Sequence, residues 1–298
     1  MSIVPPLLVA GLLAVGALVL VGPGPSWVAR WPFLHRVPRA AVVLWQAGAV
    51  AALVCVFGLA WLVSAQARSD ASALPWWGWV ATVAVLLFAV TVAVRLVWAL
   101  VRVVATTGAR RRRHRDLVDI IASTTASELV DQPAGLRVLA EARPLAYCLP
   151  GLLQSRVVLS AGTLSMLSAQ EVAAVLAHEQ AHLRARHDVV LATFDAVHQA
   201  FPHAIRSELP AQQSRLLVEM LADDVAVRAV GRTPLGRALV ALSDTAVPEA
   251  ALGVGRQSTR VRLERLSEDA PPRGLAVAIY ALAAALVVAP VLALVVAG

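Results

Sequence analysis

Lysine is absent from this chain, and cysteine is nearly absent. All 26 basic residues are arginine, and the two cysteines are Cys55 and Cys148. Two cysteines support neither a disulfide framework nor a cysteine-based zinc site. A chain without lysine cannot contain the Ser-x-x-Lys motif of acylating enzymes and sensors. The sequence also has no glycine-rich phosphate loop and no repeat of the solenoid kind, so it shows no sign of phosphate-loop nucleotide binding or of a repeat architecture.

Charged residues are scarce as well, at 15% of the chain, while hydrophobic residues make up 59% and the mean hydropathy is +0.72. This composition is too apolar for a soluble protein of this size, so it predicts a chain largely embedded in a membrane. Four runs are long enough to span a bilayer, at residues 3–21, 40–65, 76–104 and 274–297. The first has no positive residue before it and no small-residue cleavage site, so we expect a retained span rather than a signal peptide.

Arginines set the predicted orientation of these spans. They gather between the first two spans and directly after the third, as Arg30, Arg36 and Arg39, and as Arg110–Arg113 with Arg115. By the positive-inside rule both groups are cytoplasmic, which places the N-terminus outside and residues 110–273 in the cytoplasm. The exclusive use of arginine, with abundant alanine and valine, indicates a GC-rich bacterial source, and we expect the cytoplasmic membrane as the location.

The arginine groups have a simple explanation in membrane lipids. A juxtamembrane basic cluster is attracted to anionic headgroups, and this accounts for the net charge of +7 better than nucleic acid does. We therefore expect membrane lipids as partners and no direct nucleic-acid binding. Arg95 and Arg102 interrupt the third span near its inner end, from which long side chains can reach the headgroups.

The most informative segment is His178-Glu179-Gln180-Ala181-His182. Two imidazoles four residues apart on a helix share one face, and a catalytic zinc site needs three protein ligands with a fourth position left to water. His178 and His182 would be two of the ligands, and Glu179 would be the base that passes a proton from water to the leaving amine. Ser168 and Glu171 form a capping-box pattern, which predicts that a helix begins there and contains the motif. The segment therefore predicts a zinc hydrolase with one Zn²⁺ per chain.

Glu219 is the best candidate for the third zinc ligand, on a second helix that Pro210 and Gly231 bracket. Asp223 lies one turn further along the same face, where its carboxylate could accept a hydrogen bond from the free nitrogen of a ligand histidine. The usual alternative for two such carboxylates is a solvated helix face. Beside an intact zinc motif we favour the ligand role for Glu219 and the supporting role for Asp223.

With these residues the chain resembles the membrane-bound gluzincin peptidases, whose pattern is HExxH followed by ExxxD on a later helix. The resemblance covers about residues 115–270 and includes the segments Pro144–Gly151, Arg156–Ser160, Arg186–Asp188 and Arg260–Leu266. Two relatives compete, the BlaR/MecR antirepressor peptidases and the HtpX-like membrane peptidases. Three spans before the metal domain and one after it resemble the BlaR/MecR order, which we prefer, whereas HtpX-like enzymes usually place two spans before the motif and further hydrophobic segments after it.

The resemblance implies an α-helical integral membrane protein with a cytoplasmic α+β zincin-like (gluzincin) metalloprotease domain. We expect three transmembrane helices in residues 1–104, the zinc metallopeptidase domain in residues 105–273 and a fourth transmembrane helix in residues 274–298. Antirepressors carry an external penicillin-binding domain after the last span, whereas this sequence ends at Gly298 and contains no lysine. We therefore expect no covalent β-lactam sensing by this polypeptide.

Short strands are predicted at residues 136–140, 145–149 and 156–160, which gives a small mixed sheet beside a helical core. In zinc peptidases of this kind the substrate adds to an edge strand. The resemblance favours Tyr147, Cys148 and Leu149, or residues 156–160, for that edge. The alternative is that these strands form part of the core and do not bind substrate. Candidate donors to the developing oxyanion are His198, His203, Arg215 and Arg228. His187 and Asp188 belong either to the surroundings of the metal or to a polar helix end.

Three functions remain open from the sequence. The first is a zinc-dependent endopeptidase that cuts cytoplasmic or membrane-proximal proteins, with a transcriptional repressor as the preferred substrate. The second is an HtpX-like protease for membrane-protein quality control. The third is a zinc-stabilised membrane scaffold or signal transducer without proteolysis.

Overall fold

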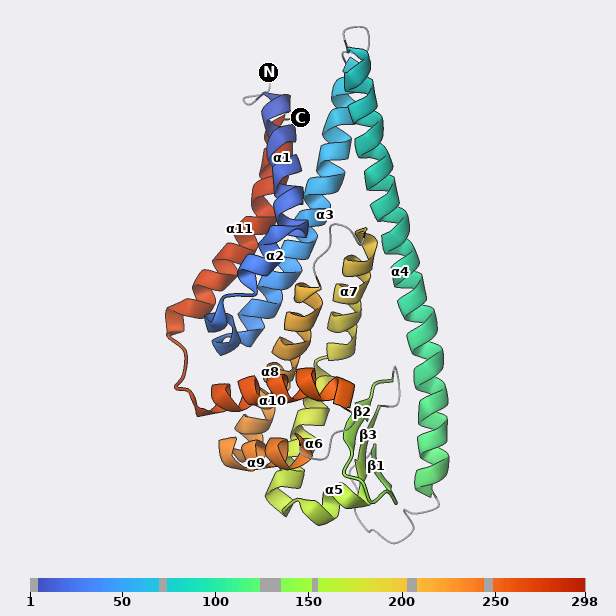
Figure 1. The fold of residues 1–298 in the computed structure, drawn as a ribbon, viewed down its shortest axis with the longest axis vertical. Coiled ribbons are helices and arrows are strands. Elements are labelled where there is room, and N and C mark those ends of the chain that lie inside the picture. The colour runs from blue at the N-terminus through green and yellow to red at the C-terminus, as the bar shows by residue number, and fades with distance from the viewer. Residues whose placement is uncertain are drawn as a thin grey trace. The chain divides into compact units, whose positions relative to one another are not determined.

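The structure is a computed structural model that describes residues 5–69, 74–123, 135–151, 155–202, 208–243 and 249–297. Its elements follow the chain (Figure 1) as α1 (Pro6–Val21), α2 (Pro23–Val28), η1 (Pro32–Arg36), α3 (Pro38–Ser69), α4 (Trp76–Ser123), β1 (Leu136–Leu139), β2 (Ala146–Leu149), β3 (Arg156–Ser160), α5 (Ala161–Met166), α6 (Ala169–Arg184), α7 (His187–Ala200), α8 (Leu209–Val230), α9 (Arg232–Ser243), α10 (Glu249–Ser267) and α11 (Arg273–Ala297). The chain divides into two compact units. The first comprises residues 1–101, 192–214 and 271–298, and the second comprises residues 102–191 and 215–270.

Three helices of the described residues are long and apolar enough to cross a membrane: α3, residues Trp76–Val103 of α4, and α11. They correspond to the second, third and fourth predicted spans. Helix α1 is also apolar, but its 16 residues extend only about 24 Å, against a hydrocarbon core of about 30 Å. Because the first predicted span begins at residue 3, outside the described residues, its crossing of the membrane stays a prediction.

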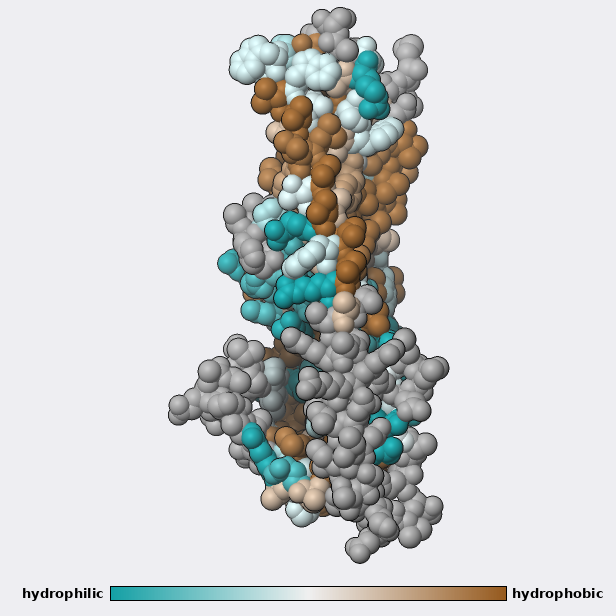
Figure 2. Space-filling view, turned by 90° about the vertical axis from the view of Figure 1, so that its right-hand side faces the viewer, coloured by the Kyte–Doolittle hydropathy of each residue, from teal (hydrophilic) through white to brown (hydrophobic). Residues whose placement is uncertain are grey.

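In the first unit α1, α3 and α11 pack against one another. Their shared core contains Val9, Leu13, Cys55, Leu62 and Ala297. The α3–α11 contact is close at Gly58, where an added Cβ would lie 2.6 Å from Leu294 Cδ1 and the leucine side chain would have to shift. The outward faces carry exposed apolar side chains (Figure 2, upper half), and a bilayer would cover such a surface without cost.

Arg95 on α4 caps a helix instead of extending to the headgroups as predicted. Its Nε donates to the carbonyl oxygens of Gln199 at 3.1 Å and Ala200 at 3.2 Å, and its Nη2 donates to those of Gln199 at 3.0 Å and Phe201 at 3.4 Å. The last carbonyls of a helix have no partner within it, and a cation there also complements the helix dipole. The end of α7 is thereby held among the apolar helices, and residues 192–214, which lie within the predicted domain of residues 105–273, cluster with the first unit.

The second unit contains a three-stranded sheet in the order β1-β3-β2. β1 is parallel to β3 and β2 is antiparallel to it, so the predicted strands and the predicted mixed sheet are confirmed. One core joins the sheet to α6 and α9 through Leu159, Leu167, Val175 and Ala238. β2 is an edge strand of this sheet among the described strands.

The helices that carry the predicted zinc motif begin and end as the sequence predicts. Ser168 Oγ accepts from the Glu171 backbone N–H, and the Glu171 carboxylate accepts from that of Ser168, which completes the capping box of α6. Helix α8 ends at Val230, and Gly231 follows with φ of +93°, a left-handed conformation that glycine adopts without strain. The start of α6 and the end of α8 are therefore both fixed by the residues that the sequence analysis identified.

Candidate metal centre

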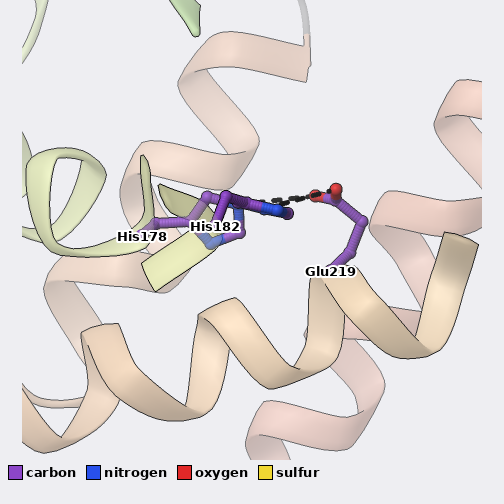
Figure 3. A group of neighbouring side chains, drawn as sticks. All are labelled: His178, His182 and Glu219. Carbon is purple, nitrogen blue, oxygen red and sulfur yellow. Dashed lines mark hydrogen bonds and ion pairs between the residues drawn. The ribbon is translucent and has the colours of Figure 1, made fainter. Parts of the chain in front are cut away.

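His178 and His182 on α6 face Glu219 on α8 (Figure 3). The two Nε2 atoms lie 3.2 Å apart. His178 Nε2 is 3.4 Å from Glu219 Oε2, and His182 Nε2 is 3.5 Å from Glu219 Oε1. The predicted spacing on each helix thus brings the three candidate ligands together.

These distances suit zinc. Zinc bonds of about 2.0–2.2 Å to nitrogen and oxygen place neighbouring donors of a tetrahedral site roughly 3.3–3.5 Å apart. The two Nε2 atoms are 3.2 Å apart, and each lies 3.4 or 3.5 Å from a different oxygen of Glu219, so the three side chains are close enough to share one ion after a small adjustment of the carboxylate. Three such donors leave one tetrahedral position for water or substrate. The residues present therefore fit a zinc ion, with the chemistry of a catalytic rather than a closed structural site.

His178 is 8% exposed, and its second ring nitrogen faces Asp223, as predicted. Nδ1 lies 3.0 Å from Asp223 Oδ1, close in distance although off line for a hydrogen bond. Burial disfavours the protonated ring, but the carboxylates of Asp223 and Glu219 outweigh it and raise the pKa of His178 to about 9. The negative charge of Asp223 beside Nδ1 favours the neutral tautomer with its proton on Nδ1, and that tautomer presents Nε2 to a metal.

His182 has a different partner, the ring of His187. Their Nδ1 atoms are 3.1 Å apart, so His182 can donate its Nδ1 proton to His187 and keep Nε2 free. Burial lowers the pKa of both rings, that of His182 to about 4, which favours the neutral forms this contact needs. Arg186, just before His187, is the one non-glycine residue with positive φ (50°) in the described part of the chain, and its Nη1 donates to the Gly151 carbonyl at 3.0 Å. The sequence left two roles open for His187, and its contact with His182 places it in the surroundings of the metal site.

Arg262 on α10 is the main residue that sequence reasoning missed. Its guanidinium donates to both carboxylate oxygens of Asp223, at 2.8 and 2.6 Å, and lies 3.1 Å from Glu219 Oε2. Burial alone would raise the pKa of both carboxyls, but His178 and Arg262 hold each at about 2. The resemblance to the gluzincin peptidases included the segment Arg260–Leu266, which was the only indication that this part of the chain belongs near the site. Nothing in the sequence indicated which of its arginines points inward.

Glu179 lies beside His178 on α6 and shares its surroundings with Cys148 of β2. Burial is the largest influence on the Glu179 carboxyl and raises its pKa, against the opposing effects of His178 and the Cys148 thiol. The thiol itself is neutral, because burial and then the charge of Glu179 raise its pKa to about 12. A carboxylate with a raised pKa is closer to the condition in which it can both take and return a proton.

The remaining predicted site residues lie in several places. Arg215 and Arg228 are exposed on α8, before Glu219 and after Asp223. His198 belongs to the first unit, where Nε2 is 3.3 Å from Glu208 Oε2 and the ring lines an apolar cavity of about 280 Å³. His203 lies outside the described residues. The structure thus leaves the oxyanion donor as a prediction.

Comparison with known proteins agrees with this geometry. No curated protein and no solved structure matches the chain. The model of peptidase family M48 matches residues 109–268, which is more than half of the chain and includes His178, His182, Glu219 and Arg262. Members of this family are zinc-dependent metallopeptidases. The chain therefore belongs to peptidase family M48.

Proposed function

We propose that this protein is a membrane-bound zinc endopeptidase that hydrolyses peptide bonds of cytoplasmic or membrane-proximal proteins. One observation carries the proposal: two histidines of α6 and a carboxylate of α8 bring their metal-binding atoms together, with the Glu179 carboxylate directly beside His178 in the sequence. His178, His182 and Glu219 would hold the metal. The candidate spans support membrane anchorage, and the distribution of arginines favours a cytoplasmic peptidase domain and an external N-terminus.

Bound zinc would polarise the substrate carbonyl and lower the pKa of a water molecule. Glu179 accepts a proton from that water and donates it to the departing amine, for which its raised pKa is suited. The Asp223 carboxylate lies 3.0 Å from Nδ1 of His178, and His187 can accept the Nδ1 proton of His182, so both partners favour the tautomers whose Nε2 lone pairs face the site.

β2 is the proposed binding edge for the substrate backbone. Its other side is not paired to any strand of the described residues, so it can accept an added strand. Tyr147 and Leu149 pack in a cluster with Val158, and side chains alternate along a strand, so Cys148 points to the opposite face. That face is the one on which Glu179 interacts with the Cys148 thiol. A substrate strand beside β2 would therefore run past the general base.

Among substrates we prefer a transcriptional repressor, as in the BlaR/MecR-like interpretation. That choice depends on α1 acting as a third span before the metal domain. If the 16-residue α1 does not cross the membrane, the span order comes nearer to that of the HtpX-like enzymes, which favours membrane-protein quality control. A zinc-stabilised scaffold or signal transducer without proteolysis is the non-enzymatic alternative.

The test compares new protein N-termini in cells that express the wild-type chain or Glu179→Gln, at equal expression and with zinc content measured. Glu171→Gln is the matched control, because it lies on the same helix and glutamine also completes a capping box. We expect N-termini that are present with the wild type and Glu171→Gln and absent with Glu179→Gln. One or a few such termini indicate repressor cleavage, and many indicate quality control. Identical termini in all three strains, with zinc bound, would contradict proteolysis and favour the scaffold.

A further inference from the structure

We propose that Arg262 is a positioning residue for the metal centre and makes α10 the third helix of the site. The inference rests on the proposed zinc site of His178, His182 and Glu219. Among the described residues neither histidine forms a hydrogen bond or ion pair with α10, so the helix would act on the metal through the Arg262 guanidinium group and the two carboxylates that it contacts.

The geometry is that of a planar fork with one extra contact. Nε and Nη2 of Arg262 donate to Oδ2 and Oδ1 of Asp223 at 2.8 and 2.6 Å, and Nη1 lies 3.1 Å from Glu219 Oε2. A guanidinium has its donors in fixed directions, so binding two carboxylates at once sets their mutual orientation. Asp223 is fully buried and Arg262 is 8% exposed, which makes this arrangement rigid.

Glu219 is the residue that needs such support. Its side chain is 37% exposed, so packing alone does not select one rotamer for it. Arg262 shares Oε2 with His178, while Oε1 remains directed at His182. Holding one oxygen leaves the other available to a metal in the direction of the two rings, which reduces the ordering that metal binding would otherwise require.

The positive charge of Arg262 also supports its role as a positioning residue. Glu219 and Asp223 are one turn apart on α8, and like charges at this spacing repel each other. Arg262 contacts both and lies close enough to Glu179 to be influenced by its charge. The Arg262 guanidinium therefore reduces the repulsion between these carboxylates, so that they can stay close together around a metal.

The chain offers a matched control in Arg265, one turn further along α10. Its Nη2 donates to Asp224 Oδ1 at 2.6 Å, and its Nη1 donates to the Met220 carbonyl at 3.4 Å. It thus makes an α10–α8 ion pair of the same kind with the neighbour of Asp223. Arg265 forms no hydrogen bond or ion pair with Glu219 in the described part of the chain, so its loss removes a contact between α10 and α8 without removing support of the ligand.

The experiment uses the full chain in detergent, freed of metal with a chelator, and measures the zinc Kd by competition with a chromophoric chelator. Arg262→Gln should raise the Kd by about tenfold to hundredfold, the range for residues that support ligands, and Arg262→Lys should raise it less. Arg265→Gln should leave the Kd at the wild-type value. The Co²⁺ absorption spectrum should change in both Arg262 variants and stay unchanged in Arg265→Gln.

The outcomes separate this inference from the proposed function. Equal zinc Kd values for wild type, Arg262→Gln and Arg262→Lys would overturn the positioning role while the zinc site stands. An equal rise in Arg265→Gln would reduce Arg262 to a helix-docking residue and overturn it as well. If Arg262→Gln does not fold, Arg262→Lys decides, and a wild-type Kd and Co²⁺ spectrum in that variant would refute the role. Failure of the wild-type chain to bind zinc would refute the proposed function itself.

Discussion

Zinc uptake by this protein should displace a proton from His178, and Asp223 should control how firmly that proton is held. The carboxylates of Asp223 and Glu219 overcome the effect of burial and raise the pKa of His178 from 6.5 to about 9. Burial lowers the pKa of His182 to about 4, and Glu219 has a pKa of about 2, so both are already in the form that binds metal at neutral pH. Asp223→Asn keeps the shape of the side chain and removes its charge.

The size of the effect follows from the two pKa values. At about pH 8 a group with a pKa of 9 carries about 0.9 proton, whereas one with a pKa of 6.5 carries about 0.03. The wild type should therefore release close to one His178 proton per zinc, and Asp223→Asn should release fewer. Below pH 9 the competition should also weaken the apparent zinc affinity of the wild type, and the loss should approach about tenfold per pH unit once the ring is mostly protonated.

Calorimetric titration of the metal-free protein with zinc in two buffers of different ionisation enthalpy counts the released protons. Ionisation of a zinc-bound water contributes to the count in both proteins, so the difference between wild type and Asp223→Asn is the quantity that reports on His178. The thermal midpoint of the chelator-treated protein supplies a second measurement, in which no metal-bound water is present.

The sign of the second measurement follows from linkage. His178 binds its proton more tightly in the folded state, so its stabilising contribution is complete below about pH 6.5 and is lost as the pH rises to about 9. The metal-free midpoint should therefore fall across this window, while the stabilisation added by zinc should grow. Equal proton release by the two proteins, or a metal-free midpoint that rises from pH 6.5 to 9, would refute this account of His178.

Two further substitutions test contacts that the sequence did not indicate. His187→Phe keeps a ring against His182 but removes the Nδ1 acceptor that lies 3.1 Å from the His182 Nδ1. This substitution should raise the zinc Kd by about tenfold in the chelator competition assay. An unchanged Kd would exclude support of His182 by His187. Arg95→Met leaves the carbonyls at the end of α7 without their cationic donor, a loss of about 1.5–3 kcal/mol that should lower the thermal midpoint in detergent by several degrees. Arg68→Met, at an exposed position of α3, is the control, and equal midpoints for the two variants would show that the cap is not stabilising.

The ligand set could be predicted because its information is local. His178 and His182 are one turn apart on α6, and Glu219 and Asp223 are one turn apart on α8, so helical geometry alone aligns each pair. The capping box of α6 and Gly231 after α8 are equally local, and both were predicted correctly. The strands were also predictable, since each is a short apolar segment between turn residues.

Contacts that join distant segments were beyond the sequence. Arg260, Arg262 and Arg265 lie close together on one helix, and only the fold distinguishes them: Arg260 is exposed and pairs with Glu264 on its own helix, whereas Arg262 is buried against a residue 39 positions away. Arg95 likewise finds its carbonyl partners 104 to 106 residues further along the chain. Helix periodicity indicates which residues share a face, but it does not indicate which element covers that face.

The buried pair of Asp223 and Arg262 is better explained by metal binding than by folding stability. Removing two charges from water costs several kcal/mol per ion, and apolar residues of similar volume often stabilise a protein as well as a buried ion pair does. Those residues would not place a negative charge beside Nδ1 of His178 or hold one oxygen of Glu219, whereas this pair has contacts of 3.0 and 3.1 Å to those two groups. Replacing Asp223 and Arg262 together by apolar side chains should therefore raise the zinc Kd while the thermal midpoint of the chelator-treated protein changes little.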